Sequence, residues 1–323
     1  MDKLAHYDGQ PLSQHIADVW LAMDAEAYAP KTIEDYREKW GPFYVALGRE
    51  LGRRPLLADL QLDAARRYII ARLRPDGERR PLAPVSAAAH VRVLKALSTR
   101  LFKEGKTGTN RLSALREPRG EGEEKTALTA DEVGSVLDAA SGITLGARRN
   151  GALIAVLVDV GPRISEILAA NVEDIDWTKG WIRILHPAKR GPRRNIPLGR
   201  ETRRLLQAYL GKRRRGPLFL ESEETRMTAA AARQVLARLS ARLEIARVSP
   251  HDLRHTAATF YSRLITDDAV AAKVFGWAPA VDYTKARYTH LSWEDVAAIH
   301  QKGSPLDHIV GLRRRRVAGR LAA

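Results

Sequence analysis

One stretch near the middle of the chain limits what the sequence can fold into. From Arg116 to Lys125 it reads "REPRGEGEEK", in which every residue is charged, a proline or a glycine. Such a segment has no apolar surface to bury and is typical of an exposed linker between domains. A chain of 323 residues is also long enough for two domains of roughly 100–200 residues each. We therefore predict a first domain over residues 1–118, a linker over 119–127, a second domain over 128–303 and a basic tail over 304–323.

The first domain has helical periodicity throughout. From Leu12 to Gly105 apolar residues recur at helical spacing, and breaks at "YAPKT", "LGRRP" and "LRPDGERRPLAP" divide this part into four predicted helices. In the last of these helices one apolar stripe is predicted to be buried: Val85, Val91, Leu94, Leu97 and Leu101. The other side of the same helix carries cations: Arg92, Lys95, Arg100 and Lys103. This cationic face either meets phosphate or is simply solvated.

The second domain is predicted to be mostly helical, with one β-hairpin. Thr129 followed by Glu132 has the form of a capping box and marks the start of a helix. The β-branched segments Trp181–Leu185 and Asn195–Leu198 flank a loop of Pro, Gly, Lys and Arg, which predicts a hairpin with a basic tip. Further helices are expected at Arg200–Arg214, at Ala229–Leu243, from His251, at Asp267–Phe275 and at Trp293–His300. The predicted fold class is mainly α with a small β-hairpin or sheet.

Charge and composition narrow the range of partners. The 54 Lys and Arg against 38 Asp and Glu give a net charge of +16, which favours a polyanion, nucleic acid first. The absence of cysteine excludes disulfides, thiolate nucleophiles and cysteine-ligated metals. The start of the chain has no apolar signal segment, and no apolar run approaches the roughly 20 residues that span a bilayer. The sequence thus predicts a cytoplasmic protein that associates with DNA and not with a membrane.

Two segments combine residues that bind phosphate. Arg163 follows a Gly-Pro break at the predicted start of a helix, where backbone N–H groups also favour an anion. In "SPHDLRH" the i, i+3 spacing puts His251 and Arg254 on one helix face, so both could contact one phosphate. A metal pair from His251 and His255 is the alternative, but it lacks the Glu of H-E-x-x-H and a third ligand. We therefore expect no metal and no cofactor.

A third segment, "VFGWAPAVDYTKARYTHLSWEDV", contains Trp277, Tyr283 and Tyr288. A tyrosine is a poor nucleophile at its ordinary pKa near 10, but neighbouring cations can stabilise the phenolate. Each tyrosine taken alone could equally be a packing residue.

The order of these pieces resembles the tyrosine recombinase or phage integrase family. Arg in "GPRISE", Lys in a hairpin, His-x-x-Arg, Gly-Trp and then Tyr follow one another, and the likeness runs through residues 12–300, as in the simple two-domain members of the Xer or Cre type. The resemblance implies a SAM-like helical core DNA-binding domain, followed by a tyrosine-recombinase (DNA breaking-rejoining) catalytic domain from Leu128 onward.

The resemblance also implies roles for single residues. The implied catalytic set is Arg163, Lys189, His251, Arg254, Trp277 and Tyr288. Glu166 and His255 would position the catalytic residues without contacting the substrate. The implied DNA-binding residues are Arg92, Lys95, Arg100, Lys103, Arg190 and Arg193. Lys189 is chosen because it stands eight residues before Pro197, with Lys179 as the alternative. Trp277 and Tyr288 are farther apart than in the family, so Tyr283 remains a second candidate nucleophile.

Taken together, the resemblance implies a site-specific DNA recombinase. It would cut and rejoin a double-stranded recombination site through a 3′-phosphotyrosyl intermediate, without metal or ATP, as a dimer on each site and a tetramer in the synapse. Residues 293–309 resemble a C-terminal helix that docks on a neighbouring protomer; a helix packed on its own domain is the alternative. Two other functions stay open: a non-catalytic DNA-binding protein with a degenerate integrase fold, and DNA relaxation like that of type IB topoisomerases.

Overall fold

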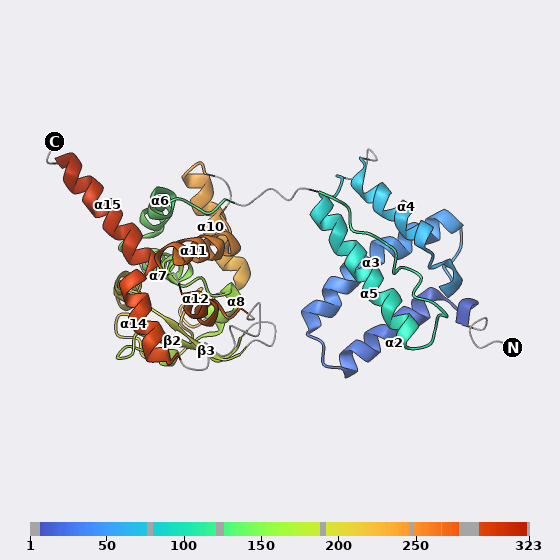
Figure 1. The fold of residues 1–323 in the computed structure, drawn as a ribbon, viewed down its shortest axis with the longest axis horizontal. Helices are drawn as coiled ribbons and strands as arrows, with labels where there is room; N and C mark the ends of the chain where they lie inside the picture. The colour runs from blue at the N-terminus through green and yellow to red at the C-terminus, as the bar shows by residue number, and fades with distance from the viewer. Residues whose placement is uncertain are drawn as a thin grey trace. The chain divides into compact units, whose positions relative to one another are not determined.

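The computed structural model describes residues 7–75, 80–120, 126–187, 192–245, 248–265, 267–277 and 291–321, with side chains up to residue 316. The chain divides into two compact units, Met1–Glu124 and Lys125–Ala323, which are described separately (Figure 1). The division falls inside the segment predicted as a linker. Lys189, Arg190, Tyr283 and Tyr288, all named from the sequence, lie outside the described residues.

The N-terminal unit confirms the predicted helices. They are α2 (Leu12–Ala25), α3 (Pro30–Leu51), α4 (Leu62–Leu73) and α5 (Pro84–Lys103), with a 3₁₀ turn η1 (Leu57–Asp59) between α3 and α4. Pro30 and Pro84 open α3 and α5, where the missing N–H of proline costs nothing. Aromatic rings join α3 to α4, since the centroid of the Phe43 ring lies 5.3 Å from that of Trp40 and 5.4 Å from that of Tyr68.

The apolar stripe predicted on α5 is mostly correct. Val91, Leu94, Leu97 and Leu101 are at most 1% exposed, so these residues form the buried seam of the helix. Val85 is 61% exposed, and its predicted burial is wrong. It lies in the first turn of α5, directly after the opening Pro84, where the helix is not yet covered by its neighbours.

The C-terminal unit is helical around a small sheet, which confirms the predicted fold class. Its helices are α6 (Ala130–Ala140), α7 (Leu145–Asp159), α8 (Ile164–Ala169), α9 (Arg200–Leu210), α10 (Ala229–Arg242), α11 (Pro250–Leu264), α12 (Asp268–Phe275), α14 (Trp293–Gly303) and α15 (Pro305–Leu321), with a 3₁₀ turn η2 (Val172–Asp174). The strands β1 (Ile175–Asp176), β2 (Trp181–Ile184) and β3 (Arg194–Pro197) are antiparallel, in the order β1-β2-β3. Ile182 pairs with Ile175 on one side and with Ile196 on the other. Strand β1 was not predicted, because two residues are too few to show an alternating pattern.

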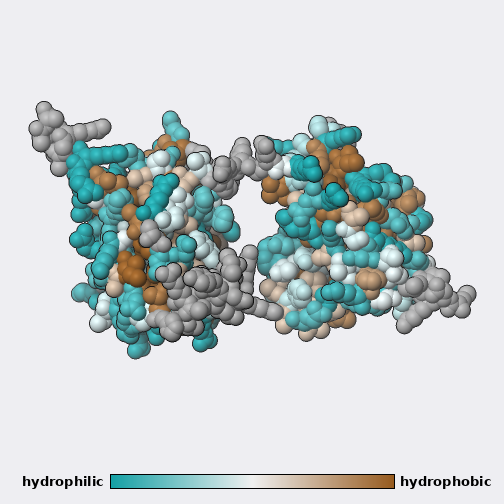
Figure 2. Space-filling model, viewed as in Figure 1, coloured by the Kyte–Doolittle hydropathy of each residue, from teal (hydrophilic) through white to brown (hydrophobic). Residues whose placement is uncertain are grey.

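Helix α7 is the centre of this unit. Its apolar run from Ala152 to Val158 is at most 1% exposed at every position. Helices α6, α9, α11 and α15 all pack against α7, which explains why its sequence is apolar on every side. In the described part of the chain, no helix is both long and apolar enough to cross a membrane. On the face shown in Figure 2, hydrophilic residues surround smaller apolar patches on both units.

The two C-terminal helices belong to the core of the same unit. Val296 in α14 and Leu306 and Ile309 in α15 are fully buried. Helix α15 packs on α6, α7 and α9, as the red helix beside α6 and α7 in Figure 1 shows. Residues 293–309 therefore pack on their own domain, and most of the expected basic tail is helix α15. This is the arrangement that the sequence analysis gave as the alternative to docking on a neighbouring protomer.

Candidate active site

Helix α11 begins as its sequence predicts. The Oγ of Ser249 accepts from the N–H of Asp252 (3.3 Å), and the carboxylate of Asp252 accepts from the N–H of Ser249 (2.9 Å), so the turn is closed from both sides. This capped turn places His251 at the surface and Arg254, one turn later, in the interior, where it is 9% exposed. The two residues share a helix end but lie at different depths.

Arg254 is held by two backbone carbonyls. Its guanidinium donates to the carbonyl oxygens of Gly161 and Phe275, the latter at 2.9 Å, and lies 5.3 Å from the centre of the Phe275 ring. Burial, together with the charge of Arg163, lowers the pKa of Arg254 to about 10. The side chain is thus still a cation at neutral pH, but one with little water around it. Such a cation gains more from a bound anion than an exposed arginine does.

The turn from α7 into α8 brings Arg163 to the same place. Gly161 has φ +52°, and a Cβ on it would lie 2.9 Å from Cε1 of Phe275 and 3.0 Å from Cβ of Ala257. Only glycine allows this close approach of the turn to α11 and α12. Arg163 follows directly, with a side chain that is 31% exposed and therefore accessible to a ligand.

Glu166 links two arginines beneath this turn. Its carboxylate accepts from the backbone N–H of Arg163 (3.0 Å) and from Nη1 of the Arg163 side chain (3.1 Å). On its inner side it accepts from Nη2 and Nη1 of Arg194 at 2.6 and 3.2 Å. The Glu166 side chain has no exposure and that of Arg194 only 3%, so this is a buried ion pair.

Arg194 was missed in the sequence analysis. It follows Arg193 in a run of basic residues that predicted only an exposed hairpin tip, and Arg193 is indeed exposed. A signal was available, because Arg194, Ile196 and Leu198 alternate along β3 and all three are buried. Strand periodicity places Arg194 on the inner face of the sheet.

Trp277 lies just beyond the end of α12. Gly276 adopts φ +62° and ends the helix, and the N–H of Trp277 donates to the carbonyl of Ala272 (3.0 Å). The indole stacks on Phe275 with a centroid distance of 4.7 Å and remains 46% exposed. Trp277 and Arg254 thus both pack against the Phe275 ring. Arg254 also bonds the carbonyl of Gly161, in the turn that carries Arg163.

Comparison with known proteins agrees with this arrangement. Residues 126–294 match the model of the phage integrase family. This chain belongs to that family. It is 28% identical to tyrosine recombinase XerC of Azotobacter vinelandii over 280 residues, which cover 85% of this chain and 90% of the relative. It is 33% identical to tyrosine recombinase XerD of Mycobacterium tuberculosis over 221 residues, 63% of this chain and 70% of the relative.

Solved integrases share the fold. A lambda integrase tetramer bound to a Holliday junction is similar with a TM-score of 0.67 and 18% identity, over 88% of this chain and 80% of the other. The Tn1549 transposon integrase in complex with a circular intermediate DNA gives a TM-score of 0.66 and 18% identity, over 90% and 98%. The predicted family and enzyme class, a tyrosine-type site-specific DNA recombinase, are confirmed.

In this integrase the described residues also tie α12 to the start of α14. The Nζ of Lys273 donates to the carbonyl of Leu291 and lies 4.6 Å from the centre of the Trp293 ring. Burial lowers the pKa of Lys273. The alternative hairpin residue, Lys179, also contacts the start of α14, because its ammonium pairs with Glu294 at 2.9 Å.

The histidines of α11 are both at the surface. His251 and His255 are both exposed, and the positioning role predicted for His255 remains a prediction. The described residues also contain no group of three His, Asp or Glu side chains suited to hold a metal ion.

The cations predicted on α5 are partly engaged by acids. Arg92 pairs with Glu117 at 2.9 Å, and Arg100 pairs with Glu104 at 3.0 Å and also with Glu26. Lys95 is half-buried, whereas Lys103 is exposed. This face is therefore less cationic than its sequence suggests.

A second basic surface of the N-terminal unit was not predicted. We call it the arginine groove; it lies along α3 and α4 and is lined by Pro42, Val45, Ala46, Arg49, Tyr68, Ala71, Arg72, Arg74 and Arg80. No acidic residue is among these lining residues. The Nε of Arg72 is buried and has no hydrogen-bond partner in the described part of the chain. Its arginines are scattered over two helices and a loop, so only the fold brings them together.

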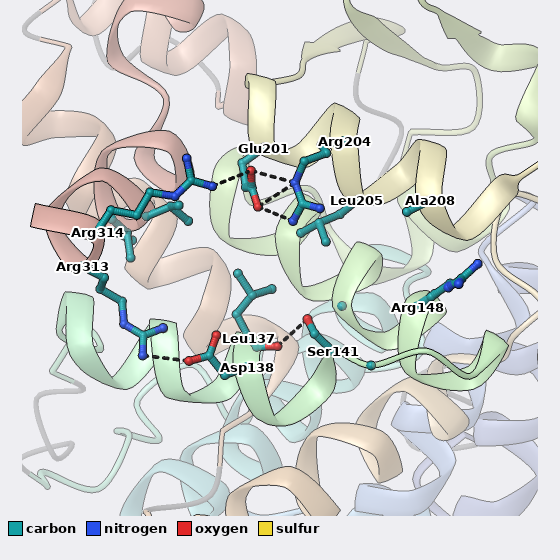
Figure 3. A pocket seen from close by; sticks show the side chains of 15 residues that line it. Leu137, Asp138, Ser141, Arg148, Glu201, Arg204, Leu205, Ala208, Arg313 and Arg314 are labelled. Atoms are coloured by element: carbon teal, nitrogen blue, oxygen red, sulfur yellow. Dashed lines mark hydrogen bonds and ion pairs between the residues drawn. The ribbon is translucent and has the colours of Figure 1, made fainter. Parts of the chain in front are cut away.

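A cavity of about 720 Å³ lies elsewhere in the C-terminal unit, among α6, α7, α9 and α15 (Figure 3). Arg313 reaches across it to Asp138 (2.8 Å), and Arg204 bonds Glu201 (2.6 Å). Arg163, His251, Arg254 and Trp277, the predicted catalytic residues that the structure describes, do not line this cavity. The Arg313–Asp138 pair joins α15 to α6, whereas the Arg204–Glu201 pair lies within α9.

Proposed function

We propose that this integrase cleaves DNA by attack of Tyr288 on a scissile phosphate and rejoins the strand to a new partner. The observation that carries the proposal is the meeting of Arg163 and Arg254 at the Gly161 turn, because Arg254 donates to the carbonyl of Gly161 and Arg163 follows two residues later at the start of α8. Two arginines placed together, one of them buried, favour a bound anion. A phosphodiester is the anion that this family of enzymes acts on.

The proposed chemistry keeps the number of phosphoester bonds constant. The Tyr288 phenolate forms a bond to phosphorus, the 5′-oxygen leaves, and the 3′ side stays attached as a phosphotyrosyl ester. Lys189 gives the leaving oxygen its proton as general acid. Attack by another strand's 5′-hydroxyl reverses these steps, so neither ATP nor water is consumed.

Charge stabilisation in the transition state is assigned to the arginines. The pentavalent phosphate carries more localised negative charge than the diester, so donors aimed at it stabilise the transition state more than the bound substrate. Arg163 and Arg254 supply the positive charge, while His251 and the indole N–H of Trp277 donate hydrogen bonds. No metal takes part in the proposed mechanism.

The N-terminal unit is proposed to bind the duplex backbone. The arginine groove offers several cations with no acid among its described lining residues, and Lys103 adds an exposed cation on α5, which suits contacts to phosphates. The similar lambda integrase has been solved as a dimer on a core site and as a tetramer on a Holliday junction. We propose the same assembly for this chain: a dimer per site and a tetramer in the synapse.

Covalent trapping tests the proposed reaction. Nicked suicide duplexes from DNA flanking the gene are incubated in EDTA with the wild type, Tyr288→Phe and Tyr283→Phe, and run on a denaturing gel. We expect a shifted protein–DNA band that is lost only in Tyr288→Phe, because phenylalanine cannot form the ester. A band lost only in Tyr283→Phe would move the nucleophile to that residue.

Two other outcomes would change the function. Clear binding without any covalent band would show a DNA-binding protein with a degenerate integrase fold. A band together with relaxation of supercoiled plasmid, but no recombinant product from paired sites, would show an activity like that of type IB topoisomerases.

A further inference from the structure

Among the described residues of the site, Arg194 is a deeply buried cation. Its side chain is 3% exposed, against 31% for Arg163, so of these two arginines it is Arg163 that can reach a phosphate. We propose that Arg194 is a positioning residue that takes up the charge of Glu166, so that Arg163 stays available to the DNA. This inference rests on the function proposed above.

The distances show how the carboxylate is divided. Arg194 holds both oxygens of Glu166 in a bidentate pair, at 2.6 and 3.2 Å, whereas the side chain of Arg163 reaches one oxygen at 3.1 Å. A bidentate, buried pair is the stronger of the two, because it has two aligned hydrogen bonds and little water around it. The carboxylate of Glu166 is thus bound more tightly by the buried Arg194 than by Arg163, whose side chain is accessible to the ligand.

The charges of the cluster support the same reading. Arg163, Arg194 and Arg254 lie around the one carboxylate of Glu166. Besides burial, the charges of Arg163 and Arg194 lower the pKa of Arg254, and the charge of Glu166 raises it. With Arg194 present, Arg163 shares the Glu166 carboxylate with a second arginine, and the cluster keeps a net positive charge for a phosphate. Without Arg194, more of the negative charge of Glu166 falls on Arg163, and the phosphate must then compete with a buried acid.

Arg194 also connects three parts of the site. Its Nε donates to the carbonyl of Val274 (3.0 Å) in the last turn of α12, and a Cβ on Gly276 would lie 3.1 Å from its Cζ. One side chain therefore joins strand β3, which follows the hairpin loop, to helix α8 through Glu166 and to the turn before Trp277. Removing the Arg194 side chain is therefore expected to change both the charge at the site and the positions of these three elements. An experiment that varies the charge of the DNA separates the two effects.

The test measures the cleavage rate and duplex binding of Arg194→Met, Arg194→Lys and Arg194→Met/Glu166→Gln beside the wild type. Each is assayed on the mapped site with an ordinary scissile phosphate and with a neutral methylphosphonate in its place. We expect Arg194→Met to slow cleavage of the ordinary site by roughly 10- to 100-fold, the usual range for residues that position a catalytic residue without touching the substrate. DNA binding should change much less. Lysine, which keeps the charge, and the double variant, which removes the acid, should each recover part of the loss.

The methylphosphonate distinguishes charge from folding. If Arg194 acts through the cation offered to the phosphate, its loss costs less when the scissile linkage is neutral. Arg226→Met is the matched control, because Arg226 bonds the carbonyls of Leu168 and Ala170 at the other end of α8 without touching Glu166. Its penalty, if any, should be equal on both linkages.

Two results would overturn the proposal. One is cleavage by Arg194→Met within about threefold of the wild type, well short of the loss expected for a positioning residue. The other is an equal penalty on the charged and the neutral linkage, which would leave Arg194 a purely structural role. A wild type that forms no covalent adduct would instead reject the proposed function itself, so the two failures are distinguishable.

Discussion

The two units of this integrase hold their arginines in opposite ways. In the N-terminal unit, Arg49, Arg72, Arg74 and Arg80 line a surface groove with no acid among them. In the C-terminal unit, Arg194 and Arg254 are buried around Glu166. Exposed cations attract a polyanion over a distance, and salt screens that attraction. Buried cations act only at contact but far more strongly, which suits binding in the first unit and chemistry in the second.

The two units also differ in where the acids that stabilise their folds lie, buried in the C-terminal unit and at the surface in the N-terminal unit. Asp159 is fully buried at the end of α7 and accepts from the N–H of Gly199 (2.7 Å), Oγ1 of Thr202 (2.7 Å) and Oγ of Ser304 (2.6 Å), with Nε2 of His300 at 3.2 Å. Burial alone would raise the pKa of Asp159, but His300 and these hydrogen bonds outweigh it and lower the pKa. The cluster fastens α14 and α15 to α7 and α9. In the N-terminal unit the pair Arg92–Glu117 lies at the surface.

The largest expected effect comes from breaking the Asp159 cluster. Asp159→Ala leaves several buried donors and His300 without their acceptor, so the C-terminal unit should lose about 3–5 kcal/mol of unfolding free energy. Hydrogen exchange on the full chain measures this unit by unit: α7, α14 and α15 should exchange faster, while α2 to α5 stay unchanged. Glu117→Ala is the surface control and should cost less than about 1 kcal/mol. Unchanged exchange in α14 would show that the cluster does not hold the C-terminal helices.

Removing a buried and an exposed arginine should affect different steps. We expect Arg254→Ala, like Arg163→Ala, to slow cleavage about 100- to 1,000-fold with little change in binding, because the contact is stronger in the transition state. Arg74→Ala should instead weaken binding at all sequences and reduce the slope of log K against log salt by about 1. Cleavage at saturating DNA should be unaffected in that variant. A parallel decrease of binding and cleavage in Arg254→Ala or in Arg74→Ala would contradict this difference between the two units.

The smallest effect concerns pH and the N-terminal unit. Burial lowers the pKa of His15, next to Lys106, Asp18 and Asp8, and of His90, next to Arg72 and Lys39. Both imidazoles are thus neutral in the fold but take up a proton near pH 6.5 when unfolded, so the unit should lose stability as pH falls below about 6.5. Urea unfolding of the full chain at pH 7.5 and pH 5.5 measures this loss.

His90→Gln makes the pH prediction specific. The Nδ1 of His90 lies 3.0 Å from the hydroxyl of Tyr68 and 3.1 Å from the carbonyl of Lys39, and an amide can replace part of these contacts. The variant should be less stable at neutral pH but less sensitive to acid. An equal pH dependence in the wild type and in His90→Gln would assign the acid sensitivity to other groups.

Local patterns predicted the helices and their starts well. The capping box at Thr129 and Glu132 and the turn at Ser249 both form as expected, because these contacts lie within four residues of each other. The burial of Val85 was predicted wrongly, and the sequence left two alternatives open for residues 293–309, since what covers an apolar residue depends on other elements. The arginine groove was missed for the same reason.

The sequence by itself determined the order of the elements, the family and the identity of the residues that could bind a phosphate. These depend on residue types and on short spacings, which the chain carries locally. Only the tertiary structure decided that Arg254 is buried while His251 is not, that Arg194 rather than Arg193 pairs with Glu166, and that α15 packs on its own domain. Burial and pairing depend on residues far apart in the chain, and the exposure of a charged side chain decides whether it attracts DNA or orients a neighbouring group.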